Sequence, residues 1–195
     1  ANDVQALDEV NAQTGAQLAL GEDWDTIKGT WATLLKQTEV LQPMVNFDEH
    51  TTIIENTAEF LIKVSNNAKL ILDPDIDSYY LIDLVTNDVP ELTETIAQIR
   101  GYGTYLIASR SLAPNALTKM SDLNGLVNAR TDSTKEFYNY VFIDNSAVGT
   151  QLEAAINSYY DDAYTFLDNV QQHFYNAPES NKLIYIKTSD PSAFF

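Results

Sequence analysis

The residues in this 195-residue sequence best suited to holding a ligand are three arginines, Arg100, Arg110 and Arg130. They all lie in the central third of a strongly acidic chain. An arginine in such surroundings either pairs with a nearby aspartate or glutamate, or binds the carboxylate of a small anionic ligand through its planar guanidinium. Both alternatives are open from the sequence. An arginine at a core-type helix position, as the spacing gives Arg110, must reach a partner or extend to the end of the bundle.

A second group combines aromatic and acidic side chains. Asp83 follows Tyr79 and Tyr80 by about one helical turn. These residues either form a buried hydrogen-bonded pair that fixes the helix register, or line a site for an amine, which requires aromatic rings converging on an acid. We therefore predict a small anionic or amine ligand. The candidate binding residues are Tyr79, Tyr80, Asp83, Arg100 and Arg110.

The acidic cluster Asp73, Asp75 and Asp77 resembles the start of a calcium loop but departs from it at two positions. An EF-hand needs a glycine at its sixth position and a glutamate at its twelfth, where this chain has Ser78 and Leu84. Helix capping and favourable early charge account for the three carboxylates without a metal. We expect no metal site here.

The sequence also lacks the patterns of catalysis. There is no cysteine, no glycine-rich phosphate loop, and neither GxSxG nor HExxH. His50 and His173 are far apart and have polar neighbours, so we expect both to lie on the surface. We predict a protein that is not an enzyme, with no catalytic residue and no cofactor.

The charge balance excludes one class of partner. Twenty-eight acidic against eleven basic residues give a formal net charge of −17, and such a surface repels polyanions, so we expect no nucleic-acid binding. No apolar run reaches the roughly 18–20 residues of a membrane-spanning helix. Because the chain opens within an amphipathic pattern and stops abruptly at Phe195, we expect residues 1–195 to be one region cut at both ends from a longer protein.

The clearest structural pattern lies in residues 82–106. Apolar or small residues recur there in alternating steps of three and four, at Ile82, Val85, Val89, Leu92, Ile96, Ile99, Gly103 and Leu106. This heptad spacing predicts a long helix whose stripe other helices must cover. With few glycines and no alternating strand pattern, the chain is predicted to be all-α: an elongated antiparallel helical bundle, in one module or two stacked ones.

Six helices are expected, over residues 2–20, 22–42, 48–72, 74–111, 115–142 and 147–176. Gly21 is expected to stop the first helix and Pro43 the second. The face predicted to be buried on the third helix consists of Ile54, Ala58, Leu61, Val64, Ala68 and Ile71. Pro74 either opens the fourth helix after a tight reversal, with Asp73 as N-cap, or kinks one continuous helix. Pro90 is expected to kink the fourth helix, and residues 183–186 to pack on the bundle in an extended conformation.

The segment LILDPDIDSYYLIDLVTNDVPELTETIAQIRGYG, residues 70–103, resembles a stretch found in extracytoplasmic regions of bacterial transmembrane receptors. These receptors include methyl-accepting chemotaxis proteins, sensor histidine kinases and diguanylate-cyclase receptors. The matching residues are Asp73, Pro74, Asp75, Asp77, Ser78, Tyr79, Tyr80, Leu81, Asp83, Pro90, Glu91, Leu92, Arg100 and Gly101. Many such receptors also carry Arg-Gly near their first helix, where this chain has Gln13-Thr14-Gly15.

The resemblance implies a ligand-sensing region on the periplasmic side of the bacterial inner membrane. In the full-length protein, membrane-spanning helices and a further C-terminal helix would flank it, and helix displacement would pass to a cytoplasmic output. The resemblance also implies a homodimer in the full receptor, although the excised region could be a monomer. The alternative is a periplasmic interaction or dimerisation bundle that binds no small molecule itself.

Overall fold

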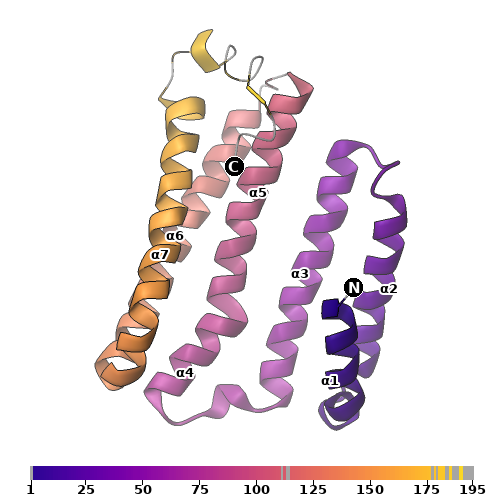
Figure 1. Cartoon of the computed structure of the whole chain (residues 1–195), viewed down its shortest axis with the longest axis vertical. Coiled ribbons are helices and arrows are strands. Elements are labelled where there is room, and N and C mark those ends of the chain that lie inside the picture. The colour runs from indigo at the N-terminus through magenta and orange to yellow at the C-terminus, as the bar shows by residue number, and fades with distance from the viewer. Residues whose placement is uncertain are drawn as a thin grey trace. The chain divides into compact units, whose positions relative to one another are not determined.

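The computed structural model describes residues 2–110, 112, 115–176, 178, 180–182, 185 and 189–190. These residues are helical over most of their length and form no β-strand, which confirms the predicted all-α fold (Figure 1). The chain divides into two compact units, Ala1–Pro90 (unit 1) and Glu91–Phe195 (unit 2).

Unit 1 is built from three long helices followed by shorter helical pieces. Its elements are α1 (Asn2–Leu18), α2 (Gly21–Gln37), α3 (Pro43–Asn67), the 3₁₀ turn η1 (Leu70–Leu72), α4 (Ile76–Asp83) and the π-helix η2 (Leu84–Asp88). The chain reverses after α1 and again after α2, so that α2 packs against both α1 and α3 (Figure 1). The buried side chains of unit 1 include Leu20, Trp24, Leu34, Ile53 and Ser65, together with Leu84 of η2.

Two predicted helix boundaries in unit 1 are wrong. The first helix ends at Leu18, where Ala19 takes a left-handed conformation with φ 55°, and Gly21 is the first residue of α2 rather than a stop. Pro43 begins α3 instead of ending α2, which stops at Gln37. A proline fits the first turn of a helix because the amide it lacks has no partner there.

The predicted buried face of α3 is also wrong. Ile53 and Ser65 are buried, whereas Ile54 and Leu61 are 42% and 36% exposed. Ile71 lies beyond the helix, in η1, and is exposed. Because α3 carries apolar residues on more than one face, periodicity alone could not identify the face that unit 1 covers.

The chain reverses between α3 and α4, as the first alternative for Pro74 predicted, and the continuous kinked helix is wrong. Lys69 has φ 59°, and η1 follows it. The Asp73 carboxylate then accepts a hydrogen bond from the Asp75 amide at 3.0 Å. The helix starts at Ile76, so Asp75 rather than Asp73 occupies the N-cap position.

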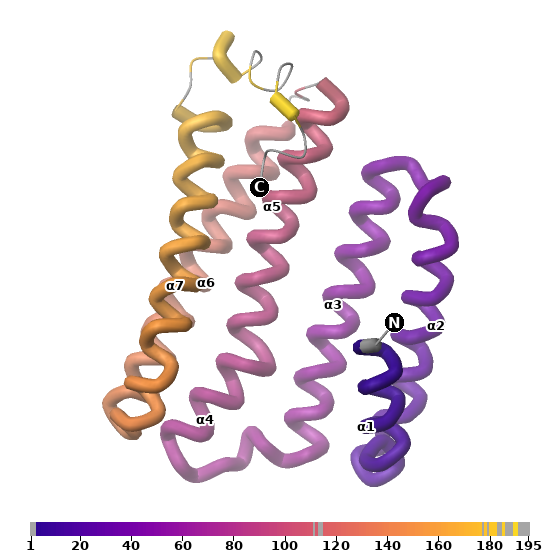
Figure 2. The backbone as a smooth tube through the Cα atoms, viewed as in Figure 1, coloured from indigo at the N-terminus to yellow at the C-terminus, as the bar shows by residue number. Residues whose placement is uncertain are grey.

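Unit 2 contains three long helices around a single core. α5 (Val89–Ser109) follows η2 without a break, and then come α6 (Ala116–Asp144), α7 (Ser146–Val170) and the π-helix η3 (Gln171–Tyr175). The chain path reverses between successive helices (Figure 2). The completely buried apolar side chains are Leu92, Ile99, Ile107, Ala116, Met120, Val127, Val141, Val170 and Phe174.

The predicted heptad stripe is correct at Leu92, Ile99, Gly103 and Leu106, which are buried. It is wrong at Ile96, which is only half-buried while Thr95 is buried beside it, and it is wrong before Leu92. Leu92 and Ile99 are fully buried in unit 2, but Val85 is 68% exposed and Leu84 is buried in its place. The π-helix η2 causes this change of register, because its wider turn inserts an extra residue. Within η2 the Val89 amide bonds to the Leu84 carbonyl, five residues back. Pro90 explains the wider turn, since its ring would collide with the carbonyl four residues earlier in a regular α-helix.

Candidate functional site

The tyrosines and the aspartate predicted to bind a ligand all lie on α4 in unit 1. Tyr79 is 44% exposed, while Tyr80 and Asp83 are half-buried. The rings of Tyr79 and Tyr80 meet edge to face, with centroids 5.3 Å apart. Tyr79 and Asp83 are four residues apart, so they occupy the same side of the helix. The surface of α4 therefore presents an aromatic ring and a carboxylate close together.

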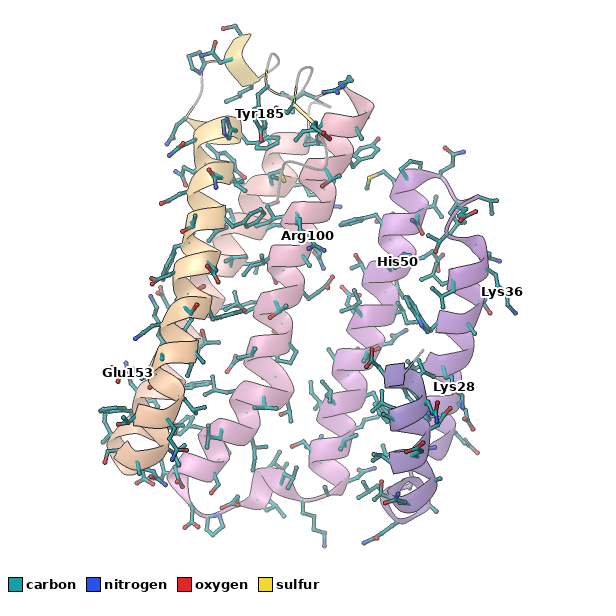
Figure 3. All side chains as sticks on the ribbon, in the orientation of Figure 1. Lys28, Lys36, His50, Arg100, Glu153 and Tyr185 are labelled. Carbon is teal, nitrogen blue, oxygen red and sulfur yellow. The ribbon has the colours of Figure 1, made fainter. Side chains whose placement is uncertain are left out.

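The two arginines predicted to bind a ligand belong to unit 2 and do not converge. Arg100 is exposed midway along α5 (Figure 3). Arg110 directly follows the last residue of α5, with φ 53°. Ten residues of helix correspond to about 15 Å of axial rise, too far for both guanidinium groups to hold one small anion. The Arg110 side chain is exposed and donates from Nη1 to the Ser189 carbonyl at 2.6 Å, so it extends to the end of the bundle.

The third arginine, Arg130, is the one that the structure holds in a defined polar site. Its Nη2 lies 2.9 Å from Glu91 Oε2, and its Nη1 donates to Thr95 Oγ1 at 3.2 Å. The Thr95 hydroxyl in turn donates to the Glu91 carbonyl at 2.8 Å. This guanidinium, with its side chain 30% exposed, thus joins α6 to the first turns of α5. Of the two alternatives for an arginine, structural pairing holds for Arg130.

Buried threonines continue this polar site into the core of unit 2. Thr95, Thr131 and Thr134 are all at most 4% exposed. Thr131 donates to the Val127 carbonyl at 2.7 Å, and Thr134 donates to the Arg130 and Thr131 carbonyls at 3.0 Å. Each of the three hydroxyls therefore has a hydrogen-bond partner within its own helix. Burying these threonines leaves none of their hydroxyls unpaired.

An aromatic site for a cation does form in unit 2, but a lysine of the chain fills it. Lys135 Nζ lies 5.0 Å from the ring centroid of Tyr160 and 4.5 Å from that of Tyr164. It also donates to the Tyr164 hydroxyl at 2.6 Å. These are the contacts that an amine ligand would make with an aromatic cage. Tyr159 directly precedes Tyr160 in α7. Its hydroxyl lies 3.1 Å from Thr93 Oγ1, and this contact links α7 to α5.

Unit 1 contains a polar network that the sequence did not predict. The buried Trp24 ring donates from Nε1 to Asp8 Oδ1 at 2.7 Å, and Lys28 Nζ donates to the same oxygen at 2.7 Å (Figure 3). The hydrogen bonds from Lys28 and Trp24 hold the pKa of Asp8 below its usual range. The hydrogen bond to Asp8 likewise raises the pKa of Lys28. The spacing of Trp24 and Lys28 places them on one side of α2, but the sequence does not show which acid faces them.

Aromatic side chains of η3 contact Tyr185 at the end of unit 2 that follows α7. The Tyr185 ring stacks on His173 with centroids 4.0 Å apart and an interplanar angle of 5° (Figure 3 labels Tyr185). Burial raises the pKa of Tyr185, and burial also raises the pKa of Tyr175 to about 12. The prediction of a surface His173 is therefore wrong, since the stack leaves the imidazole half-buried. The predicted extended conformation is wrong at Tyr185, which is helical, and Leu183, Ile184 and Ile186 lie outside the described residues.

The other histidine is half-buried too, and it packs between α2 and α3. His50 lies edge to face with Trp31, with centroids 6.0 Å apart, and its Nδ1 is 2.8 Å from the Asn46 carbonyl oxygen. Within the described part of the chain, no group of three or more histidine, aspartate or glutamate side chains is placed to hold a metal ion.

Comparison of the chain with protein-family models, curated proteins and solved structures gives no match. Of the helices in the described ranges, none combines the length and the apolar character that crossing a membrane requires.

Proposed function

We propose that this chain is a ligand-sensing extracytoplasmic domain of a bacterial transmembrane receptor, such as a chemoreceptor or a sensor kinase. The observation that supports this proposal most is the position of the receptor-like segment. Residues 70–103 run through α4, η2 and α5, and the boundary between the two units falls inside this contiguous helical stretch, at Pro90. The segment that resembles receptors is thus the one through which unit 1 continues into unit 2.

The helical elements of this segment suit transmission of small displacements. A π-helix such as η2 marks a place where a helix can change register at modest cost, and such turns are frequent at functional sites. Directly after it, the Arg130–Glu91 bridge fixes the start of α5 to α6. In the proposed mechanism, ligand binding shifts helices within a unit by an ångström or two, and the long helices pass this shift to the membrane-spanning segments.

The proposed ligand is a small anion or amine, and the proposed contacts remain those on exposed helix surfaces. Arg100 offers a guanidinium on α5, and Tyr79 with Asp83 offers a ring and a carboxylate on α4. Arg110 is a weaker anchor than the sequence suggested, because its guanidinium already donates to the Ser189 carbonyl. An anion that binds Arg110 must compete with this contact or use the remaining N–H groups.

A thermal-shift screen of the chain tests the proposal. The compounds are small carboxylates, amino acids, amines and nitrogen oxyanions, because a compound that binds only the folded state raises Tm by mass action. The screen is repeated on Arg100→Ala, on Arg110→Ala and on Lys36→Ala, which removes an exposed positive charge from α2. We expect one compound class to raise Tm. If that class carries a negative charge, we expect an arginine variant to abolish the shift while Lys36→Ala keeps it. A cooperative fold that no class stabilises would contradict direct sensing.

The alternative function is a periplasmic bundle that binds a protein partner or dimerises without a small ligand. Exposed apolar side chains along α3 favour it, since Val45, Ile54 and Leu61 are 44%, 42% and 36% exposed. Light scattering after size-exclusion chromatography separates the two functions. If the chain is a dimer that Ile54→Glu with Leu61→Glu converts to a monomer, and no compound shifts Tm, the interaction function is the correct one.

A further inference from the structure

We infer that Tyr185 and Ser189 form a clasp across the ends of α5 and α7, which opens when one helix moves along the other. We call this group the tail clasp. It consists of Arg110 at the end of α5, His173 and Phe174 of η3, and the two tail residues. All five belong to unit 2, so the clasp is complete within one compact unit.

On the side of α7, the clasp is an aromatic contact of defined geometry. Tyr185 lies flat on the His173 imidazole, with centroids 4.0 Å apart, and meets the Phe174 ring edge to face at 5.8 Å and 85°. Phe174 is completely buried, so it anchors this contact to the core of unit 2. The π-helix η3 sets the directions of both residues, because its wider turn differs from the regular helix that precedes it.

On the side of α5, the clasp is a charge-assisted hydrogen bond. Arg110 Nη1 donates to the Ser189 carbonyl at 2.6 Å. The Ser189 amide donates to the Tyr185 carbonyl at 2.9 Å, so the residue that stacks on η3 and the residue that accepts from Arg110 are hydrogen-bonded to each other. Tyr185 and Ser189 therefore connect Arg110, directly after α5, to η3, which follows α7.

The position of this connection makes it sensitive to helix displacement. The Thr93–Tyr159 hydrogen bond, at 3.1 Å, also links α5 to α7. From Thr93 to Arg110 the rise along α5 is about 25 Å, so the two links lie near opposite ends of α5. Helix shifts in switching proteins are about 1–2 Å, which is enough to break a hydrogen bond of 2.6 Å or to misalign a parallel stack.

This inference rests on the proposed sensor function for its biological meaning, because a displacement of α5 against α7 would reach the residues that follow Ser189 through the clasp. The geometric claim itself needs no ligand. It can therefore be tested on the chain alone, independently of the compound screen.

The first experiment measures amide hydrogen exchange at Ser189 by NMR in the chain and in three variants. Arg110→Ala removes the hydrogen bond on the α5 side, His173→Ala removes the stack on the α7 side, and the third variant carries both changes. If both contacts are needed to hold the hydrogen bond from Ser189 to Tyr185, each single change raises exchange at Ser189 by about tenfold, and the double variant exchanges no faster than the faster single variant. Multiplicative effects of the two changes, or an unchanged rate in Arg110→Ala, would overturn the clasp.

The second experiment tests whether the clasp responds to the helices. Tyr159→Phe and Thr93→Val each remove the distant α5–α7 hydrogen bond, from α7 and from α5 respectively. Tyr140→Phe is the matched control, because it removes a hydroxyl that donates to Glu136 within α6. We expect both test variants to change Ser189 exchange about two- to fivefold and the control to leave it unchanged. If the test variants change it no more than Tyr140→Phe, Tyr185 is a static anchor and the inference is wrong.

The outcomes separate this inference from the proposed function. A coupled clasp in a chain that no compound stabilises leaves the device intact and removes the small-ligand sensor. A compound that raises Tm in a chain without coupling leaves the sensor intact and places its output elsewhere than the tail.

Discussion

Arg130 of α6 holds Glu91 in the first turn of α5 by an ion pair of 2.9 Å, one residue after the proline that follows the π-helix. The same guanidinium donates to Thr95 one turn further along α5. The place where the helix recovers its regular geometry is thus also the place where it is fixed to its neighbour. This bridge accounts for one of the three arginines of the acidic chain by a structural role.

Removing either partner of this bridge is expected to destabilise unit 2 modestly. Both side chains are partly exposed, at 30% for Arg130 and 42% for Glu91, so solvent screening limits the coupling energy to about 0.3–1 kcal/mol. A double-mutant cycle of Arg130→Ala and Glu91→Ala in urea, followed by circular dichroism, measures this term. The coupling should shrink in 1 M salt. Strictly additive single effects at low salt would show that the bridge contributes nothing.

The Asp8 network predicts a specific pH dependence of the stability of unit 1. Since the folded pKa of Asp8 lies below its ordinary value of 3.8, the ionised carboxylate stabilises the fold above that value, and this stabilisation is lost as the pH falls through the folded pKa. Asp8→Asn should therefore lower Tm at neutral pH. On acidification, Tm should fall less in this variant than in the unchanged chain. Both tryptophans, Trp24 and Trp31, lie in unit 1, so tryptophan fluorescence reports this unit alone.

The matched control for this pH dependence is Asp48→Asn, at an exposed position of α3. The chain has 28 acidic residues, so the informative quantity is the difference in Tm between each variant and the unchanged chain. For Asp8→Asn this difference should shrink from pH 6 to pH 3. A difference for Asp8→Asn that shrinks no more than the difference for Asp48→Asn would contradict the assigned pKa direction.

Lys69→Gly is expected to stabilise unit 1 by about 0.5–1 kcal/mol, because a residue with a β-carbon is disfavoured in the left-handed conformation that glycine adopts freely. Lys69 has φ 59° at the end of α3, where glycine is the preferred residue. Urea denaturation followed by tryptophan fluorescence measures the change. Lys69→Ala is the control, since it removes the charge and keeps the strain. An equal gain in both variants would attribute the effect to charge instead.

Two glycines of unit 2 should respond to alanine in opposite directions. A β-carbon on Gly149 would lie 2.8 Å from Phe142 Cα, at the turn between α6 and α7, and the Gly149 carbonyl already accepts a hydrogen bond from Tyr138 at 2.6 Å. Gly149→Ala should therefore cost about 1–3 kcal/mol. A β-carbon on Gly125, within α6, would meet no atom within 4 Å, so Gly125→Ala should gain about 0.5–1 kcal/mol. Circular dichroism melts rank the two, and the reverse order would contradict the packing at the turn.

The fold class could be predicted because periodic apolar spacing is a local property of each helix. The stripe shows this, since Leu92, Ile99, Gly103 and Leu106 are all buried, although Ile96 between them is only half-buried. The boundaries were less predictable, because Pro43 both excludes a helix interior and favours a helix start. The π-helix before Pro90 was not predicted at all, and one inserted residue was enough to exchange Leu84 for Val85 on the buried side.

The polar sites could not be predicted for a different reason. The partner of Trp24 is Asp8, 16 residues away across a chain reversal. Which acid reaches the indole depends on how α1 and α2 are rotated about their axes, and no local pattern specifies that rotation. The same holds for the stack of Tyr185 on His173. The environment of Arg110 was more predictable, because an arginine in core register must reach a partner or extend to the end of the bundle. Its hydrogen bond to the Ser189 carbonyl agrees with this expectation.

The measurement that tests the sensor proposal most directly is hydrogen–deuterium exchange of the chain, read by mass spectrometry, with and without millimolar pools of carboxylates, amino acids, amines or nitrogen oxyanions. We expect one pool to slow exchange in a contiguous set of helical peptides and also to change exchange at the tail clasp. If no pool alters exchange anywhere in the chain, direct sensing of these compounds is wrong, and the exposed apolar side chains of α3 become the surface to study.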